Sequence, residues 1–579
     1  MNGAQALIEV LAQEGVRVAF GYPGGAALPL YDALYDAPLR HVLVRHEQAA
    51  VHAADGYARA SGRVGVCLVT SGPGATNLVT GLATAYMDSI PLVAVTAQVI
   101  RSLVGTDAFQ ETDVLGVTRA VTKHNRFIDG PDDVADAVRE AFAIARSGRP
   151  GPVLIDVPKD VLLAPVAAHH PRPPVLRPVS QADHSAIARA ARMIGAAARP
   201  LVLAGGGLIS AGASPALRAL IGTTGIPVAS TLMGLGAIAG DHPRHLGLVG
   251  MHGTYAANRA TANADVVIGL GLRFDDRVTG PRQRFAPRAR IIHLEIDPCE
   301  VGKCVRADLA VVGDLADTLP RLVRACAEEG VSRDGAQYRG WWTEIRSWQA
   351  HQGWVITTPM ALGGSEGCPL RPQGVIQAVC QAAGPNALVA TDVGQHQMWT
   401  ALLNPIQEPR HWLTSGGLGT MGYGLPAALG AALARPDRPV WLITGDGSLQ
   451  MNLQEMATAK NYGLAVRVVV INNNSLGMVR QWQELFHQAR YSAVDMGQLP
   501  DWEALAGAYG WYGRRVDTRE GLRGALEALD GQEGPALLDV RVSAQENVFP
   551  MVQVGQSLDD MILGEPPTAE PVAQGSLRR

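Results

Sequence analysis

The stretch VWLITGDGS at residues 440–448 and the stretch VRVVVINN at residues 466–473 decide the fold class of this chain. Each begins as a continuous apolar run and ends in side chains that carry oxygen. Continuous apolar strands are typical of parallel sheets that are covered on both faces. Asp446 and Asn473 are 27 residues apart (473 − 446), the length of one strand–helix–strand unit. Both side chains are therefore expected at the carboxyl edge of neighbouring strands, where α/β sheets bind ligands.

The same alternation of short apolar runs and helical patterns extends over the whole chain. Further apolar runs begin at residues 17, 64, 92, 153, 201, 266 and 291. The predicted fold class is therefore α/β, with three doubly wound parallel-sheet domains. Two stretches rich in Pro or Gly, 164–180 and 351–372, are predicted linkers. The expected division is a first domain at 1–165, a central Rossmann-like domain at 180–350, a third domain at 370–550 and a C-terminal tail at 551–579.

Length and composition exclude several classes of protein. The 579 residues exceed what one hydrophobic core serves, and a formal charge of −4 argues against a nucleic-acid or anionic-membrane partner. The six cysteines have no CxxC or CxxH spacing, so neither a disulfide framework nor a zinc site is expected, and a reducing cytoplasm fits best. Residues 415–434 carry no charge, but their six glycines and Pro426 indicate a buried loop and helix, not a membrane span.

The two stretches quoted first carry the chemistry of a metal–diphosphate site. Magnesium prefers oxygen ligands and completes its shell with phosphate oxygens and water. The glycines let backbone amides approach a diphosphate, whose charge is favoured at a helix N-terminus. GDG alone is usually a turn, but GDGS followed at this distance by a strand and NN resembles the motif of thiamine-diphosphate enzymes. The resemblance implies thiamine diphosphate and Mg²⁺, with metal ligands Asp446, Asn473 and the carbonyl of Ser475.

Enzymes of that family also need a glutamate that protonates the aminopyrimidine ring and so promotes ylide formation. RHEQAAVHAADGYARASG at 45–62 places Glu47 at the start of a predicted helix. An isolated Glu is usually a solvated surface residue. With FGYPGG at 20–25 and TSGPGATN at 70–77 beside it, the region resembles the family's pyrimidine-binding domain, and Glu47 is the expected proton relay.

Residues 4–550 resemble one branch, the acetolactate (acetohydroxyacid) synthase large subunits, notably in RFDDRVTG at 273–280 and SLGMVRQW at 475–482. The resemblance implies decarboxylation of pyruvate and transfer of the two-carbon unit to pyruvate or 2-oxobutyrate, the first common step of branched-chain amino-acid biosynthesis. It implies catalytic roles for Glu47, Gln110 and Lys159, and a substrate site with Phe109, Arg277 and Trp482. Expected thiamine-diphosphate ligands are Glu47, Gln395, His396, Gly419, Met421, Gly447, Ser448 and Met478.

The central domain has no thiamine motif, and GGGLIS at 205–210 fails the GxGxxG pattern because Ser210 replaces the last glycine. From spacing alone an empty Rossmann-like domain is an open alternative. The resemblance, above all RFDDR, implies bound FAD, which is expected to be structural because the net reaction moves no electrons. The implied FAD ligands are Ser89, Arg149, Gly206, Gly207, Thr231, Leu232, Met251, His252, Gly271, Arg273, Asp275, Glu295, Ile296 and Asp314.

Because Glu47 and Asp446 lie in different domains, the family pattern implies a homodimer or homotetramer with sites shared between subunits; it also admits a small regulatory subunit. A simple 2-oxo acid decarboxylase is disfavoured because residues 105–120 lack the His-His pair of that branch. A pyruvate oxidase is disfavoured by RFDDR. A silent paralogue is disfavoured because Glu47, Asp446 and Asn473 are all present. The chain departs from the family at Ile100-Arg101-Ser102, near the expected channel mouth, and at Asn474-Ser475.

Overall fold

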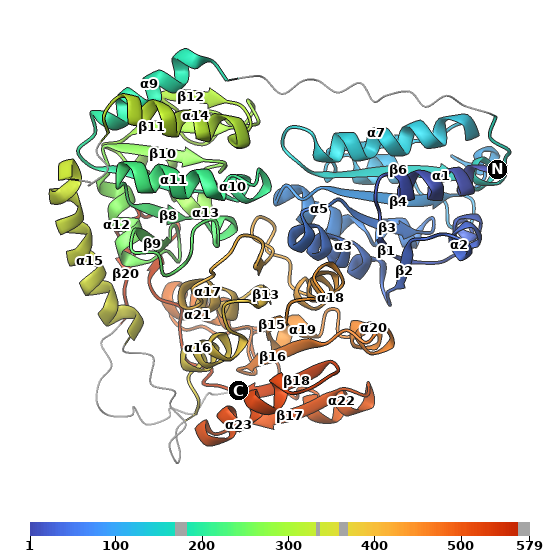
Figure 1. Ribbon diagram of the computed structural model, residues 1–579. Coiled ribbons are helices and arrows are strands. Elements are labelled where there is room, and N and C mark those ends of the chain that lie inside the picture. The colour runs from blue at the N-terminus through green and yellow to red at the C-terminus, as the bar shows by residue number, and fades with distance from the viewer. Residues whose placement is uncertain (168–181, 332–335, 358–368, 565–579) are drawn as a thin grey trace.

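The computed structural model describes residues 1–167, 182–331, 336–357 and 369–564. It contains three six-stranded sheets, and every strand pair within them is parallel. Helices flank each sheet, and the three units border on one another (Figure 1). The predicted α/β class with three parallel sheets is confirmed. Its physical basis is the burial of the strands: all residues of strands such as β10 (Val266–Leu270) are buried, as covered sheets require.

The first sheet has the order β2-β1-β3-β4-β6-β5. Its strands are β1 Val18–Tyr22, β2 Arg40–Leu43, β3 Gly65–Val69, β4 Leu92–Gln98, β5 His124–Phe127 and β6 Pro152–Pro158. The helices that matter for the site are α3 (Glu47–Ser61), α5 (Val79–Met87) and α8 (Lys159–Leu163).

The central sheet has the order β12-β11-β10-β7-β8-β9. Its other strands are β7 Pro200–Ala204, β8 Val228–Ser230, β9 His245–Leu248, β11 Arg290–Glu295 and β12 Leu309–Val312. The helices around it include α9 His184–Gly195, α11 Ser214–Thr224, α12 Tyr255–Asn263, α13 Asp276–Thr279 and α14 Leu315–Glu328.

The third sheet has the order β14-β13-β15-β16-β18-β17. Its strands are β13 Leu388–Thr391, β14 Trp412–Leu413, β15 Val440–Gly445, β16 Val466–Asn472, β17 Tyr512–Val516 and β18 Ala536–Arg541. Gly445 of β15 pairs with Ile471 of β16. Asp446 and Asn473 therefore leave the sheet at the same edge, as their spacing predicts.

The first and third units meet along a seam between α3 and α18 (Gly424–Ala434). A Cβ on Gly56 would lie 2.2 Å from the carbonyl oxygen of Ala427, and one on Gly430 would lie 1.9 Å from that of Ala53. Only glycine fits at such an approach of two backbones. Apolar on all sides, α18 is thereby buried, and among the described residues no helix is long and apolar enough to cross a membrane.

Two expectations about connecting segments need correction. Helix α15 (Arg339–Thr357) runs seven residues into the stretch 351–372 that was expected to be a linker, so its first part is helical. The expected C-terminal tail at 551–579 contains regular structure in its described part, residues 551–564, because β19 (Met551–Val552) and β20 (Met561–Ile562) form a small antiparallel sheet. This sheet contacts the central unit through a hydrogen bond of 2.7 Å from Val552 N to Met251 O. Most of the 164–180 stretch, with His169 and His170, lies outside the described residues.

Candidate active site

A cavity of about 610 Å³ lies at the carboxyl edge of the third sheet and faces the central unit. Its walls come from loops that follow β13, β15 and β16 and from loops of the central unit near β8, β9 and α13. It brings together many of the residues singled out from the sequence. These are Thr231, Leu232, Met251, His252, Arg273, Asp275, Arg277, Gln395, His396, Gly419, Met421, Asp446, Gly447, Ser448, Asn473, Ser475, Met478 and Trp482.

The corner around Asp446 has the chemistry of a cation site. Asp446 is the first residue of α19 (Asp446–Leu449), and its Oδ1 accepts a hydrogen bond of 3.0 Å from Gly447 N. Its Oδ2 is buried and has no partner. Burial raises the pKa of Asp446 to about 6, and a cation bound beside the carboxylate would favour its charged form. The residues present therefore fit a metal ion.

Asn473 and Ser475 complete this corner. Asn473 Oδ1 accepts from Ser475 N at 3.0 Å, which folds the chain back into a tight turn after β16. Across the described residues no group of three or more His, Cys, Asp or Glu side chains is placed to hold a metal ion. One carboxylate, one amide and one carbonyl suit Mg²⁺, whose remaining ligands come from phosphate and water, better than they suit zinc.

Gln395 and His396 begin α17 (Gln395–Leu403) at the end of β13. Burial lowers the pKa of His396 to about 4, so its ring is neutral, and its buried Nε2 has no partner. Gln395 Nε2 donates to Gln481 Oε1 and to the carbonyl of Glu546, both at 2.9 Å. Its free atom is therefore the buried Oε1. An unpartnered imidazole nitrogen and an unpartnered amide oxygen in one wall indicate a polar ligand.

Gly419 and Met421 lie in the loop between β14 and α18. Gly419 has a left-handed φ of 71°, which glycine adopts without strain. The Met421 Cε lies 3.7 Å from the position that a Cβ on Gly447 would take. The thioether thus reaches toward the corner around Asp446, which is compatible with the expected role of Met421 as a ligand of thiamine diphosphate.

The expected flavin ligands divide into two groups. Six of them line the cavity: Thr231, Leu232, Met251, His252, Arg273 and Asp275. The others lie mainly beyond it around the ends of β7, β10 and β11, where Gly207 N donates to Gly271 O at 2.9 Å. Burial raises the pKa of Glu295 to about 7, while its Oε1 accepts from Ile296 N at 3.0 Å.

The remaining flavin candidates are Gly206, next to Gly207, Asp314, which caps α14 through Ala316 N at 2.9 Å, and the pair Ser89 and Arg149. Arg149 Nε donates to Ser89 Oγ at 2.7 Å, and its Nη1 donates to Glu300 Oε1 at 2.8 Å. This pair therefore joins the first unit to the central unit. The buried, unpartnered Nδ1 of His252 shows that the central wall of the cavity also presents an unsatisfied polar atom, which fits a polar ligand there.

The four predicted catalytic and substrate residues of the first unit do not line this cavity: Glu47, Phe109, Gln110 and Lys159. Glu47 begins α3, and its Oε2 accepts from Asn77 Nδ2 at 2.9 Å. Phe109 is 88% exposed, which is unusual for an aromatic ring, and Gln110 has a left-handed φ of 60°. Lys159 begins α8 directly after the carboxyl end of β6. Within one chain, these four residues therefore lie outside the cavity that contains the metal corner, which is the corner formed by Asp446, Asn473 and Ser475.

Sequence reasoning missed two polar residues that support the site. Gln481 is fully buried in α21 (Gly477–Phe486), where it holds Gln395 and also accepts from Val548 N at 2.8 Å. Asp392 follows β13 as Asp446 follows β15, and its Oδ1 accepts from Gly422 N at 2.8 Å. For Asp392 the sequence offered a usable signal, a carboxylate at the end of an apolar strand. For Gln481 it offered none, because a glutamine in a helix is usually on the surface.

The chain matches known families along most of its length. Residues 1–117 match the thiamine pyrophosphate enzyme N-terminal TPP binding domain, residues 187–322 the central domain and residues 392–540 the C-terminal TPP binding domain. The acetolactate synthase large subunit of Parasynechococcus marenigrum is 48% identical over 100% of this chain and 93% of its own length. The acetolactate synthase isozyme 3 large subunit of Escherichia coli is 45% identical over 98% of this chain and 99% of its own length. With the metal corner at the expected strand ends, these matches show that the chain belongs to the acetolactate synthase large-subunit family of thiamine pyrophosphate enzymes.

Proposed function

We propose that the chain decarboxylates pyruvate and joins the two-carbon unit to a second 2-oxo acid, giving 2-acetolactate from pyruvate or 2-aceto-2-hydroxybutyrate from 2-oxobutyrate. These are the first common products of branched-chain amino-acid synthesis. The observation that carries the proposal is the corner of the cavity where Asp446 Oδ2 is buried without a partner beside Asn473 and Ser475. A buried carboxylate oxygen without a partner is costly unless a cation or donor binds it.

In this proposal Asp446, Asn473 and the Ser475 carbonyl hold Mg²⁺, and Gln395, His396, Gly447 and Ser448 surround a diphosphate. Gly419, Met421 and Met478 hold the rest of thiamine diphosphate, which supplies a nucleophilic carbon when bound. FAD would bind at the central unit as a structural group, held by the fourteen flavin candidates described above. The buried Nε2 of His396 has no partner in the protein, so a protonated Nε2 could donate a hydrogen bond to the diphosphate.

Glu47 exchanges the proton of the aminopyrimidine ring in the site of a second subunit. Its absence from the cavity of its own chain and the 88% exposure of Phe109 support this arrangement. Gln110 and Lys159 would then approach the substrate from the same partner. The minimum active unit is a homodimer, with a homotetramer as the larger form. Because the relatives are named large subunits, we add a small regulatory subunit as a further partner, in the cytoplasm.

The acceptor substrate is bound between Arg277 and Trp482. Arg277 lies 3.9 Å (Nε) from Asp276 Oδ2 in an exposed pair, which leaves its guanidinium able to grip a carboxylate. Trp482 lines the cavity and stacks edge-on against Phe486, with ring centroids 5.9 Å apart. An indole wall suits the extra methylene that separates 2-oxobutyrate from pyruvate.

The test is incubation of the purified chain with pyruvate, thiamine diphosphate and Mg²⁺, followed by measurement of acetolactate and acetaldehyde. Acetolactate is expected as the main product. Acetaldehyde as the main product would instead identify a simple decarboxylase, and dependence on an electron acceptor would identify an oxidase.

A further inference from the structure

The loop of residues 414–423 forms the part of the cavity wall that carries Gly419 and Met421. It has no regular secondary structure, and two of its glycines, Gly419 and Gly422, have left-handed φ values of 71° and 86°. Within the loop, Thr420 N donates to Ser415 Oγ at 3.0 Å. A segment of this kind needs partners outside itself to keep one conformation.

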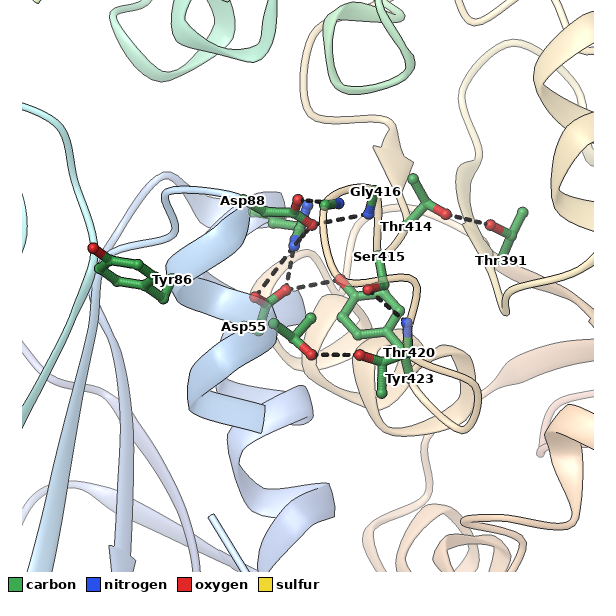
Figure 2. A network of polar contacts seen from close by, with 12 residues as sticks. Asp55, Tyr86, Asp88, Thr391, Thr414, Ser415, Gly416, Thr420 and Tyr423 are labelled. Atoms are coloured by element: carbon green, nitrogen blue, oxygen red, sulfur yellow. Dashed lines mark hydrogen bonds and ion pairs between the residues drawn. The ribbon is translucent and has the colours of Figure 1, made fainter. Parts of the chain in front are cut away.

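Asp88 of the first unit supplies such partners near the start of the loop. It follows α5 directly, and its side chain is fully buried. Its Oδ2 accepts from Gly416 N at 3.0 Å and its Oδ1 accepts from Gly417 N at 2.7 Å. Arg59 Nη2 donates to the same carboxylate at 2.9 Å. Figure 2 shows Asp88 pointing from the first unit into the backbone of this loop.

Two further contacts from the same chain hold the middle and the end of the loop. The hydroxyls of Thr84 and Thr420 lie 2.7 Å apart. Asp55 accepts from Tyr423 Oη at 2.8 Å and from Arg59 Nε at 2.5 Å (Figure 2). The first unit therefore contacts the loop at three places in sequence order.

The charges in this cluster explain why the loop cannot move away freely. Two buried carboxylates, Asp55 and Asp88, share one guanidinium, Arg59. The unmatched negative charge is stabilised by the Gly416 and Gly417 amides, and a buried carboxylate that loses such donors is strongly destabilised. Because all three partners of Asp88 are donors, an amide in its place would have to point an NH₂ group at a donor.

We infer that Asp88 is a positioning residue of the reaction, which fixes the backbone of Gly416 and Gly417 so that the 414–423 loop presents Gly419 and Met421 to the aminopyrimidine half of the cofactor. The inference rests on the proposed function, because it assigns that half of thiamine diphosphate to this loop. It also gives the first unit a second duty. The unit would supply Glu47 to the partner's site and hold the cofactor loop of its own chain.

The test compares two probes, thiamine diphosphate and inorganic pyrophosphate, each titrated calorimetrically in saturating Mg²⁺ into the flavin-loaded full-length protein. Pyrophosphate reports the metal corner alone, whereas thiamine diphosphate also reports the loop. Asp88→Asn should raise the dissociation constant of thiamine diphosphate about 10- to 100-fold. Its dissociation constant for pyrophosphate should stay within about twofold of wild type. The matched control is Asp517→Asn, which removes a half-exposed carboxylate that lies 3.0 Å from Arg515 and should change neither value.

If Asp88→Asn does not fold, Thr84→Val tests the inference in its place, because it removes only the hydroxyl that contacts Thr420. This variant should weaken the binding of thiamine diphosphate several-fold. Equal weakening of both probes, or no change in either, would overturn the inference, since a loss of general structure affects the metal corner too. Failure of the wild-type protein to bind thiamine diphosphate would instead overturn the proposed function. The near-ultraviolet circular dichroism of the bound aminopyrimidine ring provides a second readout, which should change in Asp88→Asn and not in Asp517→Asn.

Discussion

The metal corner of the third unit and the start of α3 in the first unit carry the two halves of the proposed chemistry, but they differ in how complete they are within one chain. Asp446, Asn473, Gln395 and His396 converge on one cavity. Glu47 lies outside this cavity, with Asn77 as its hydrogen-bond partner. The difference shows that one chain assembles the third unit's residues in a single cavity but does not bring Glu47 into it, which is the arrangement that the proposed sharing of sites between subunits requires.

The largest effect is expected from Glu47→Gln, which tests the role assigned to the first unit. The amide keeps the shape of the side chain but cannot exchange the proton, so turnover should fall by on the order of 10²- to 10⁴-fold while thiamine diphosphate still binds. Steady-state kinetics and a binding titration on the same preparation measure the two effects. Near-normal turnover would remove Glu47 from the role of proton relay.

A mixed dimer separates the two halves directly. Glu47→Gln and Asp446→Ala subunits, each almost inactive alone, should together regain about a quarter of wild-type activity, because half of the dimers are mixed and each of these has one intact site. Co-purification with two different tags isolates the mixed dimer for assay. No recovery in that isolated species would mean that both residues act within one chain.

Asp446→Ala tests the metal corner of the third unit alone. The change removes the only carboxylate among the three proposed metal ligands, so the dissociation constant of thiamine diphosphate in the presence of Mg²⁺ should rise on the order of 100-fold or more. Calorimetry with and without Mg²⁺ distinguishes a lost metal ligand from a general defect, since binding without the metal should change little. Unchanged affinity for thiamine diphosphate would mean that the GDGS stretch is an ordinary turn and not part of a metal site.

The smallest effect is expected at Trp482, which concerns the choice of acceptor. One buried methylene contributes about 0.8 kcal/mol and a shaped pocket about 1–3 kcal/mol, so preference for 2-oxobutyrate is roughly 10- to 200-fold at most. Trp482→Leu should remove most of this preference and leave acetolactate formation largely intact. Arg277→Lys, in contrast, should weaken both acceptors together. The product ratio with both acceptors present is the measurement, and a constant ratio in Trp482→Leu would place the selective wall elsewhere.

The sequence predicted the third sheet well because its strands are continuous apolar runs with polar residues at their ends. The 27-residue spacing placed Asp446 and Asn473 at one edge, where the β15–β16 register puts them. The buried network around Asp88 was not predictable, because its partners are backbone amides 328 and 329 residues away in the chain. The course of the chain after 550 was missed for a similar reason. Val552 and Leu558 are isolated apolar residues, and only the folded structure shows the central core against which they pack.

The glycine contacts between α3 and α18 have a consequence for the chain as a whole. Where Gly56 faces Ala427 and Gly430 faces Ala53, two helices meet almost backbone to backbone, and the Arg59 cluster lies beside them. Adhesion between the first and third units therefore does not depend on the peptide bonds that run between them. A chain cut between residues 167 and 182 should elute from a size-exclusion column as one particle. Its two fragments, when expressed separately, should associate. Continuity of the polypeptide would then matter for synthesis more than for the finished molecule.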